Sequence, residues 1–109
     1  MISESTRQRF VSIELDFPPA DIETEVIAHE AGIDTTTASA LVRLGNAIRG
    51  LEGSPLREAA STRLLILAGI LVAEGLPLRK AARSAVVRTL SDDAEVVRAL
   101  GELADALLP

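Results

Sequence analysis

Two groups of residues in this sequence could do chemistry, and both are built around arginine. One is Ser61-Thr62-Arg63, at the start of the uninterrupted apolar run Leu64–Ala73, and the other is Arg7-Gln8-Arg9-Phe10. A guanidinium is planar, always charged and able to donate in pairs to carboxylate or phosphate oxygens. An arginine beside an apolar run needs either an anionic partner or access to water. We therefore expect a negatively charged group near Arg63.

Three arrangements of Arg63 are open from the residues alone. In the first, the side chain only flanks a helix, with its stem on the core and its guanidinium in water. In the second, it forms a structural ion pair with a carboxylate of its own chain, such as Glu58 or Glu74. In the third, the guanidinium is open beside the start of its helix and is free to bind a phosphate.

Most other kinds of catalytic site are missing from the sequence. There is no glycine-rich phosphate loop, Walker-type lysine, Ser/His/Asp set or carboxylate pair spaced for acid–base work. Without Cys and with His29 as the one histidine, no conventional zinc or iron site can be assembled, so no metal site is expected. Glu23 and Glu30, two turns apart on an expected helix, are interpreted as solvated carboxylates. The chain on its own is therefore predicted not to be an enzyme.

Charge and hydropathy limit the partners. The net charge of -5 argues against nucleic-acid binding, which needs a surplus of basic residues on one face. The N-terminus does not resemble a signal peptide, and Leu64–Ala73 is too short to span a bilayer, so we expect a cytoplasmic protein without membrane association. A basic cluster is expected to be solvated and paired with nearby carboxylates; it contains Arg79, Lys80, Arg83 and Arg88.

The elements that position these residues are predicted to be one strand followed by a compact all-α bundle of about five helices. Residues 11–17 alternate between apolar and polar side chains, and Pro18-Pro19 ends that strand. A single strand has no partner within the chain. It either pairs with a second copy in a strand-mediated homodimer or belongs to a sheet that this chain does not contain. The helices are expected at about 20–31, 35–51, 54–75, 78–90 and 93–108.

Details of these helices follow from their end signals and periodicity. Gly32 is a predicted stop and Asp34 a predicted cap, while Asp92 with Glu95 is expected to form a capping box. Ser54-Pro55 is expected to open one continuous helix through Arg63 to Gly75. Because Leu64–Ala73 is apolar on all faces, this helix is predicted to be central and buried on every side, with Gly69 allowing a close crossing. The first helix is expected to bury Ile22, Val26 and Ile27.

The order of these features resembles a known family. Arg7–Val11, an alternating strand, Asp16–Pro19, two helices and then Glu58–Leu65 are similar to the C-terminal part of the CbbQ/NirQ/NorQ/GvpN branch of MoxR-type AAA+ ATPases. The resemblance extends from about Arg7 to Leu108. The Ser-Thr-Arg tripeptide alone is weak, but its combination with the earlier Gln-Arg-Phe element is specific.

The resemblance implies a role for each arginine group. Arg63 falls at the position of the family's sensor-2 arginine, which reaches the nucleotide phosphates from a helical lid. Arg9 falls at the position of an arginine finger, with Arg7 as the second choice. Residues 1–19 would then carry the finger and the last strand of a missing large subdomain, and residues 20–109 would form the lid.

The resemblance also implies what the whole protein does. The parent would be a hexameric ATPase that uses ATP and Mg²⁺ and acts with a von Willebrand factor A-type partner. It would remodel or activate a metabolic enzyme, such as Rubisco or nitric oxide reductase, or assist gas-vesicle formation. The phosphate loop, the acidic metal-binding motif and the sensor-1 residue are absent here, so the chain looks like a fragment that binds no nucleotide tightly. The alternative is a non-enzymatic helical protein–protein interaction module.

Overall fold

Every regular element in the described part of the chain is a helix. The computed structural model describes residues 17–51 and 55–109. Of the predicted strand only Phe17 is described, and it lies outside regular secondary structure; the rest of the strand, and the dimer it would form, lie outside the described residues. The elements are α2 (Ala20–Ala31), α3 (Thr35–Arg49), α4 (Leu56–Ala59), α5 (Thr62–Ala73), α6 (Leu78–Ala82), the π-helix η1 (Arg83–Val87), α7 (Arg88–Leu90) and α8 (Ala94–Leu107).

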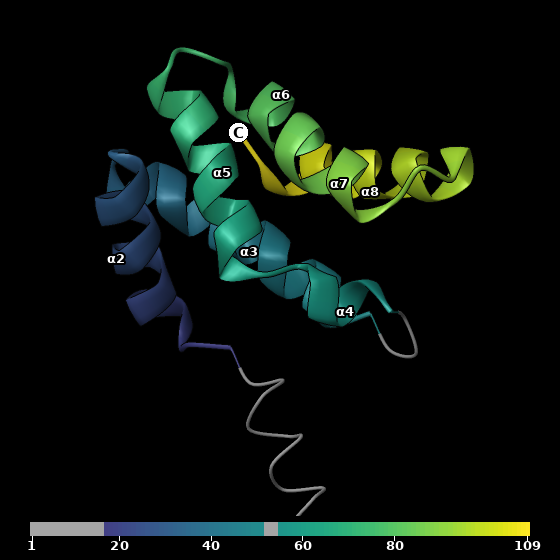
Figure 1. The fold of residues 1–109 in the computed structure, drawn as a ribbon, viewed down its shortest axis with the longest axis horizontal. Helices are drawn as coiled ribbons and strands as arrows, with labels where there is room; N and C mark the ends of the chain where they lie inside the picture. Colours follow the sequence, from purple (N-terminus) through teal and green to yellow (C-terminus); the bar gives the residue numbers. More distant parts are fainter. Residues whose placement is uncertain (1–16, 52–54) are drawn as a thin grey trace, which may run out of the picture.

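The arrangement of these helices confirms the all-α bundle. Because α6, η1 and α7 run on without a break, the described residues form five longer helical stretches and the single turn of α4. Helix α5 lies in the middle, where it contacts α2, α3, α6 and η1. Helix α8 contacts α3, α6 and η1, and Figure 1 shows the chain ending near α5 and α6. The central position predicted for the helix after Arg63 is therefore confirmed.

The ends of the first two helices are set by the residues that the sequence indicated. Helix α2 ends at Gly32, which has a left-handed φ of 73° and donates its N–H to the carbonyl of Ala28. Helix α3 is capped by Asp34, whose carboxylate accepts from the amide of Thr37 at 2.7 Å. The predicted cap of α8 was wrong by one residue. The carboxylate of Asp93, not that of Asp92, accepts from the amides of Glu95 and Val96.

The prediction of a single helix from Ser54 to Gly75 was wrong, because the helix is interrupted between α4 and α5. Ala60 (ψ 69°) and Ser61 (ψ 161°) both leave the helical conformation. In a continuous helix the carbonyl of Ala60 would accept from the amide of Leu64. Instead it accepts from Nε of Arg49 at 2.8 Å, and the side chain of Ser61 accepts from Leu64 and caps α5. Arg49 therefore binds the carbonyl that a continuous helix would need for its own hydrogen bond at this corner.

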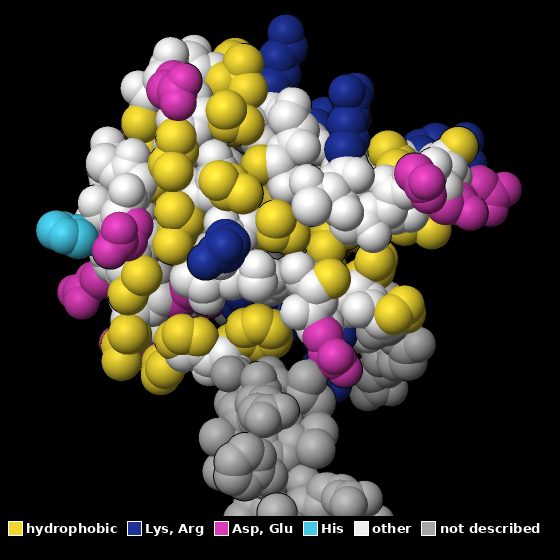
Figure 2. All heavy atoms as spheres, in the orientation of Figure 1, with side chains coloured by type: hydrophobic (Ala, Val, Ile, Leu, Met, Phe, Trp, Pro, Cys, Tyr) yellow, Lys and Arg dark blue, Asp and Glu magenta, His cyan; other side chains and the backbone are white. Residues whose placement is uncertain are grey.

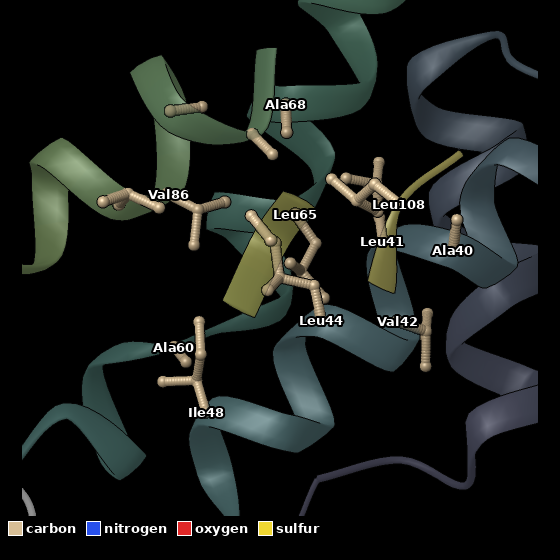
Figure 3. Close-up of a cluster of buried hydrophobic side chains, with 14 of the residues drawn as sticks. Ala40, Leu41, Val42, Leu44, Ile48, Ala60, Leu65, Ala68, Val86 and Leu108 are labelled. Carbon is tan, nitrogen blue, oxygen red and sulfur yellow. The ribbon is translucent and has the colours of Figure 1, made fainter. Parts of the chain in front are cut away.

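The core is aliphatic and gathers around α3 and α5. Figure 3 shows Leu65 of α5 beside Leu44 of α3 within this cluster. At Gly69, an added Cβ would lie 2.7 Å from the Cβ of Ala31, so α5 and the end of α2 cross at the close distance that the sequence indicated. The largest fully buried apolar side chains are Ile27, Leu41, Val42, Leu44, Ile48, Leu65, Val86 and Val87.

Two burial predictions were wrong. Helix α5 is not buried on every side, because its fully buried residues are few and Leu67 is 46% exposed. On α2, Ile27 is buried as predicted, but Ile22 and Val26 are 50% and 40% exposed. The buried side of α2 is formed by Glu23, Ile27 and Ala31, which follow one another at four-residue spacing. The prediction that Glu23 is solvated was therefore wrong, whereas Glu30 is exposed as predicted.

Candidate functional site

Arg63 lies exposed in the first turn of α5. Among the described residues its side chain makes no hydrogen bond and no ion pair, and the salt bridges found there join Arg49 to Glu23 and Arg83 to Asp105. The structural ion pair with Glu58 or Glu74 is therefore absent from the described contacts. The guanidinium is open beside the start of its helix, in the arrangement that leaves it free to bind an anion.

The surface around the start of α5 is partly apolar. Leu67 lies one turn after Arg63 on the same side of the helix, and α2 packs against α5 while exposing Ile22 and Val26. Figure 2 shows hydrophobic side chains gathered over α2 and α5 on this face. Exposed aliphatic side chains beside an unpaired guanidinium are typical of a surface that contacts another protein part or a ligand.

A buried ion pair lies directly behind this surface, and no motif in the sequence indicated it. Glu23 of α2 is 0% exposed and Arg49 at the end of α3 is 5% exposed. The two side chains meet in a bidentate pair, with Nη1 donating to Oε1 and Nη2 to Oε2, both at 2.8 Å. This fork-to-fork geometry is the strongest form of an arginine–carboxylate contact. It joins the first turn of α2 to the last turn of α3.

The remaining polar atoms of this pair are also used. Nη1 of Arg49 donates to Asn46 Oδ1 at 3.0 Å, and the hydroxyl of Thr62 donates to Glu23 Oε2 at 2.8 Å. The ring of Phe17 covers the guanidinium, with its centroid 3.7 Å from Cζ. No buried side-chain nitrogen or oxygen in the described residues lacks a hydrogen-bond partner. We call Phe17, Glu23, Asn46, Arg49, Ala60 and Thr62 the Arg49 network.

The Arg49 network keeps the Glu23 carboxylate ionised. Burial, the largest single influence, raises the pKa of Glu23 because it penalises the charged form. The hydrogen bonds from Arg49 and Thr62 and the charge of Arg49 act in the opposite direction. Together they hold the pKa of Glu23 below its ordinary value of 4.5.

This lowered pKa makes a prediction about acid stability. Glu23 binds a proton more readily in the unfolded chain, so its contribution to stability is fully present above pH 4.5 and is lost as the pH falls through the lower folded pKa. The difference in free energy of unfolding between the wild type and Glu23→Gln is expected to shrink below that pH. Urea unfolding of both proteins from pH 7 to pH 3 measures it.

The free energies of unfolding of the two proteins are compared because the pKa of the Asp34 cap is also lowered, by its hydrogen bonds from Thr37. That contribution is the same in both proteins and cancels. A difference that stays constant through the acid range would contradict an ionised, paired Glu23.

The other candidate residues are only partly described by the structure. Arg9 and Arg7 lie outside the described residues, so their placement relative to Arg63 stays a prediction. All four members of the basic cluster are exposed, as expected. Two of them have partners: Arg83 pairs with Asp105, and Arg79 donates to the carbonyl of Leu108.

Comparison with known proteins identifies the family. A family model described as CbbQ/NirQ/NorQ C-terminal matches residues 23–107, which is most of the chain. The chain belongs to this family. The match begins at the buried carboxylate of Glu23 and includes the whole break between α4 and α5, so Arg63 and most of the Arg49 network lie within it.

Individual relatives carry the same family name. The chain is 46% identical over 106 residues to protein NorQ of Paracoccus denitrificans and 45% identical over 104 residues to the denitrification regulatory protein NirQ of Pseudomonas aeruginosa. It is 38% identical over 106 residues to protein CbbQ of Hydrogenophilus thermoluteolus. These matches cover 95–97% of this chain but 39–40% of the relatives. The chain therefore spans about two-fifths of the length of the curated relatives it matches.

No described helix has both the length and the apolar composition needed to cross a membrane.

Proposed function

We propose that this chain is the C-terminal lid of an AAA+ ATPase that regulates a metabolic enzyme, and that Arg63 is its sensor-2 arginine. The observation that carries the proposal is the open guanidinium of Arg63 at the start of α5 in a chain of the CbbQ/NirQ/NorQ C-terminal family. The names of NirQ and its relatives support denitrification as one setting, with nitric oxide reductase as the target. If the full-length protein instead acts like its CbbQ relatives, its proposed target is Rubisco.

The chemistry of Arg63 supports a phosphate ligand. A guanidinium offers five N–H donors, and among the described residues none of those of Arg63 is used. Bound ATP with Mg²⁺ would supply the phosphoryl group that is transferred to water. Arg63 would bind a phosphate oxygen and stabilise the charge that develops there.

The remaining parts of such a site belong to other segments. The described residues include no group of three or more His, Cys, Asp or Glu that could hold a metal ion, so in this proposal the ligands of Mg²⁺ lie in the nucleotide-binding core of the full-length protein. Arg9 acts as the arginine finger, on the nucleotide of a neighbouring subunit in a hexamer. A von Willebrand factor A-type protein is the proposed partner, and the lid moves as a rigid body when the nucleotide is hydrolysed.

The test uses a chimera in which this chain replaces the 106 matching residues of Paracoccus denitrificans NorQ. Arg63→Ala is expected to lower kcat/KM for ATP by about tenfold to a hundredfold, since it removes charged hydrogen bonds to phosphate. Arg63→Lys keeps the charge without the planar fork, so it should recover only part of the loss. Circular dichroism should show unchanged helix content in both variants.

Arg98→Ala is the matched control, because Arg98 is exposed on α8, a helix that packs against α3, α6 and η1. It is expected to leave turnover unchanged. Equal turnover in the wild-type chimera and Arg63→Ala would overturn the sensor role, and a wild-type chimera without ATP hydrolysis would overturn the proposed function as a whole.

A further inference from the structure

We propose that the Arg49 network is a positioning unit for Arg63, and that Thr62 is the residue through which it acts. This inference rests on the proposed function of Arg63. Glu23 and Arg49 do not touch the surface on which Arg63 lies, because both are buried. They act by fixing where α5 begins and how its first turn is rotated, which decides where the guanidinium of Arg63 points.

Each of the three residues before Arg63 is held in place by a hydrogen bond. The carbonyl of Ala60 accepts from Nε of Arg49 at 2.8 Å. The side chain of Ser61 accepts from the amide of Leu64, which caps the helix. The hydroxyl of Thr62 donates to Glu23 Oε2 at 2.8 Å. Consecutive residues with fixed contacts leave the next residue little freedom of backbone orientation.

These three contacts set the residue at which α5 begins. A chain that followed ordinary helical bonding would run α4 into α5 as one helix, and Arg63 would then lie in its interior instead of its first turn. Capture of the Ala60 carbonyl by Arg49 breaks that helix two residues before Thr62. The exposed first turn that carries Arg63 therefore depends on Arg49, which is distant in sequence.

The ion pair of Glu23 and Arg49 does something here that apolar packing would not. A buried ion pair is weak grounds for stability, since well-packed apolar residues in its place are often as stable. Hydrogen bonds have direction, however, and this pair directs four arginine contacts and one threonine contact onto fixed atoms. The pair therefore specifies geometry, and the geometry it specifies is that of the corner beside Arg63.

Phe17 adds a further contact to the Arg49 network. Its ring stacks on the guanidinium of Arg49, with the centroid 3.7 Å from Cζ. The same guanidinium is thus in contact with Phe17, which precedes α2, and with the corner that precedes Arg63. A shift at one of these contacts would change the other.

Thr62→Val tests the inference in the NorQ chimera, with Thr62→Ser as its matched partner. Valine keeps the shape of threonine but removes the hydroxyl that donates to Glu23, whereas serine keeps that hydroxyl. Thr62→Val is expected to lower kcat/KM for ATP by about threefold to tenfold, the effect of one hydrogen bond. Thr62→Ser is expected to keep kcat/KM for ATP within about twofold of the wild-type value.

The decisive readout is the same substitution in the Arg63→Ala background. If Thr62 acts through Arg63, Thr62→Val should change the turnover of Arg63→Ala by less than about twofold, because coupled residues are not additive. A purely structural loss would lower turnover by the same factor in both backgrounds. Equal factors, or turnover of Thr62→Val equal to that of Thr62→Ser, would overturn the inference. If Arg63→Ala itself has no effect, the proposed function fails first.

A second measurement needs only the 109-residue chain. Amide hydrogen exchange in the first turn of α5, at Leu64 and Leu65, is expected to be faster in Thr62→Val than in Thr62→Ser, while exchange in α8 stays the same in both. An increase spread evenly over all helices would mean general destabilisation and would count against a positioning role.

Discussion

Arg49→Ala is expected to lower the free energy of unfolding by about 3–5 kcal/mol, because it leaves the carboxylate of Glu23 charged, buried and without its main partner. Glu23 is 0% exposed, so water cannot replace the lost contacts without opening the core. The carbonyl of Ala60 loses its donor at the same time. Such a loss is a large share of the stability of a small domain.

Comparing two further proteins separates the parts of this effect. In Glu23→Met/Arg49→Met both charges are gone and the volume is roughly kept, so most of the lost stability is expected to return. Arg83→Ala removes the exposed pair with Asp105 and should cost no more than about 1 kcal/mol. Urea unfolding at pH 7 followed by circular dichroism measures all of these values. An Arg49→Ala protein as stable as Arg83→Ala would show that the buried pair does not hold together the start of α2, the end of α3 and the start of α5.

Helix positions could be predicted because local signals decide them. Gly32 and Asp34 act on their own neighbours, and α2 begins and ends where the sequence indicated. The break at Ala60 could not be predicted in this way, because its cause is Arg49, eleven residues earlier on another helix. A long-range hydrogen bond overrides a local preference for helix and leaves no local pattern.

The burial of Glu23 could have been noticed from spacing. Glu23, Ile27 and Ala31 are four residues apart and share one side of α2, but the stripe of Ile22, Val26 and Ile27 contains more apolar area and led to the opposite assignment. Burying a carboxylate is unfavourable unless a cation pairs with it. Only the fold supplies that partner, since Arg49 lies at the far end of the next helix.

The candidate site was predictable to a different extent at each residue. The sequence left three arrangements of Arg63 open, and the structure shows its side chain exposed in the first turn of α5. The residues behind it belong to no motif. Thr62 was singled out as part of the Ser-Thr-Arg tripeptide, yet its contact with Glu23 emerges only when α2, α3 and α5 meet.

Leu65→Ala is expected to have the second large effect on stability, about 2–5 kcal/mol, because it removes buried methyl groups and leaves a cavity. Leu65 is 0% exposed and lies in the core between α5 and α3. A Cβ added at Gly45 of α3 would lie 2.8 Å from Cδ1 of Leu65, so the absence of a side chain at Gly45 makes room for this leucine. The two positions therefore share one space.

The coupling between Gly45 and Leu65 can be measured with a double-mutant cycle. Gly45→Ala alone gains about 1 kcal/mol of helix propensity but pushes against Leu65. In the Leu65→Ala background the same methyl group enters the cavity and recovers about a further 1 kcal/mol of apolar burial. Helix propensity contributes equally in both backgrounds and cancels, so the coupling energy reports packing alone. A coupling of at least about 1 kcal/mol is expected, and additive effects would mean that α3 and α5 do not meet at these two residues.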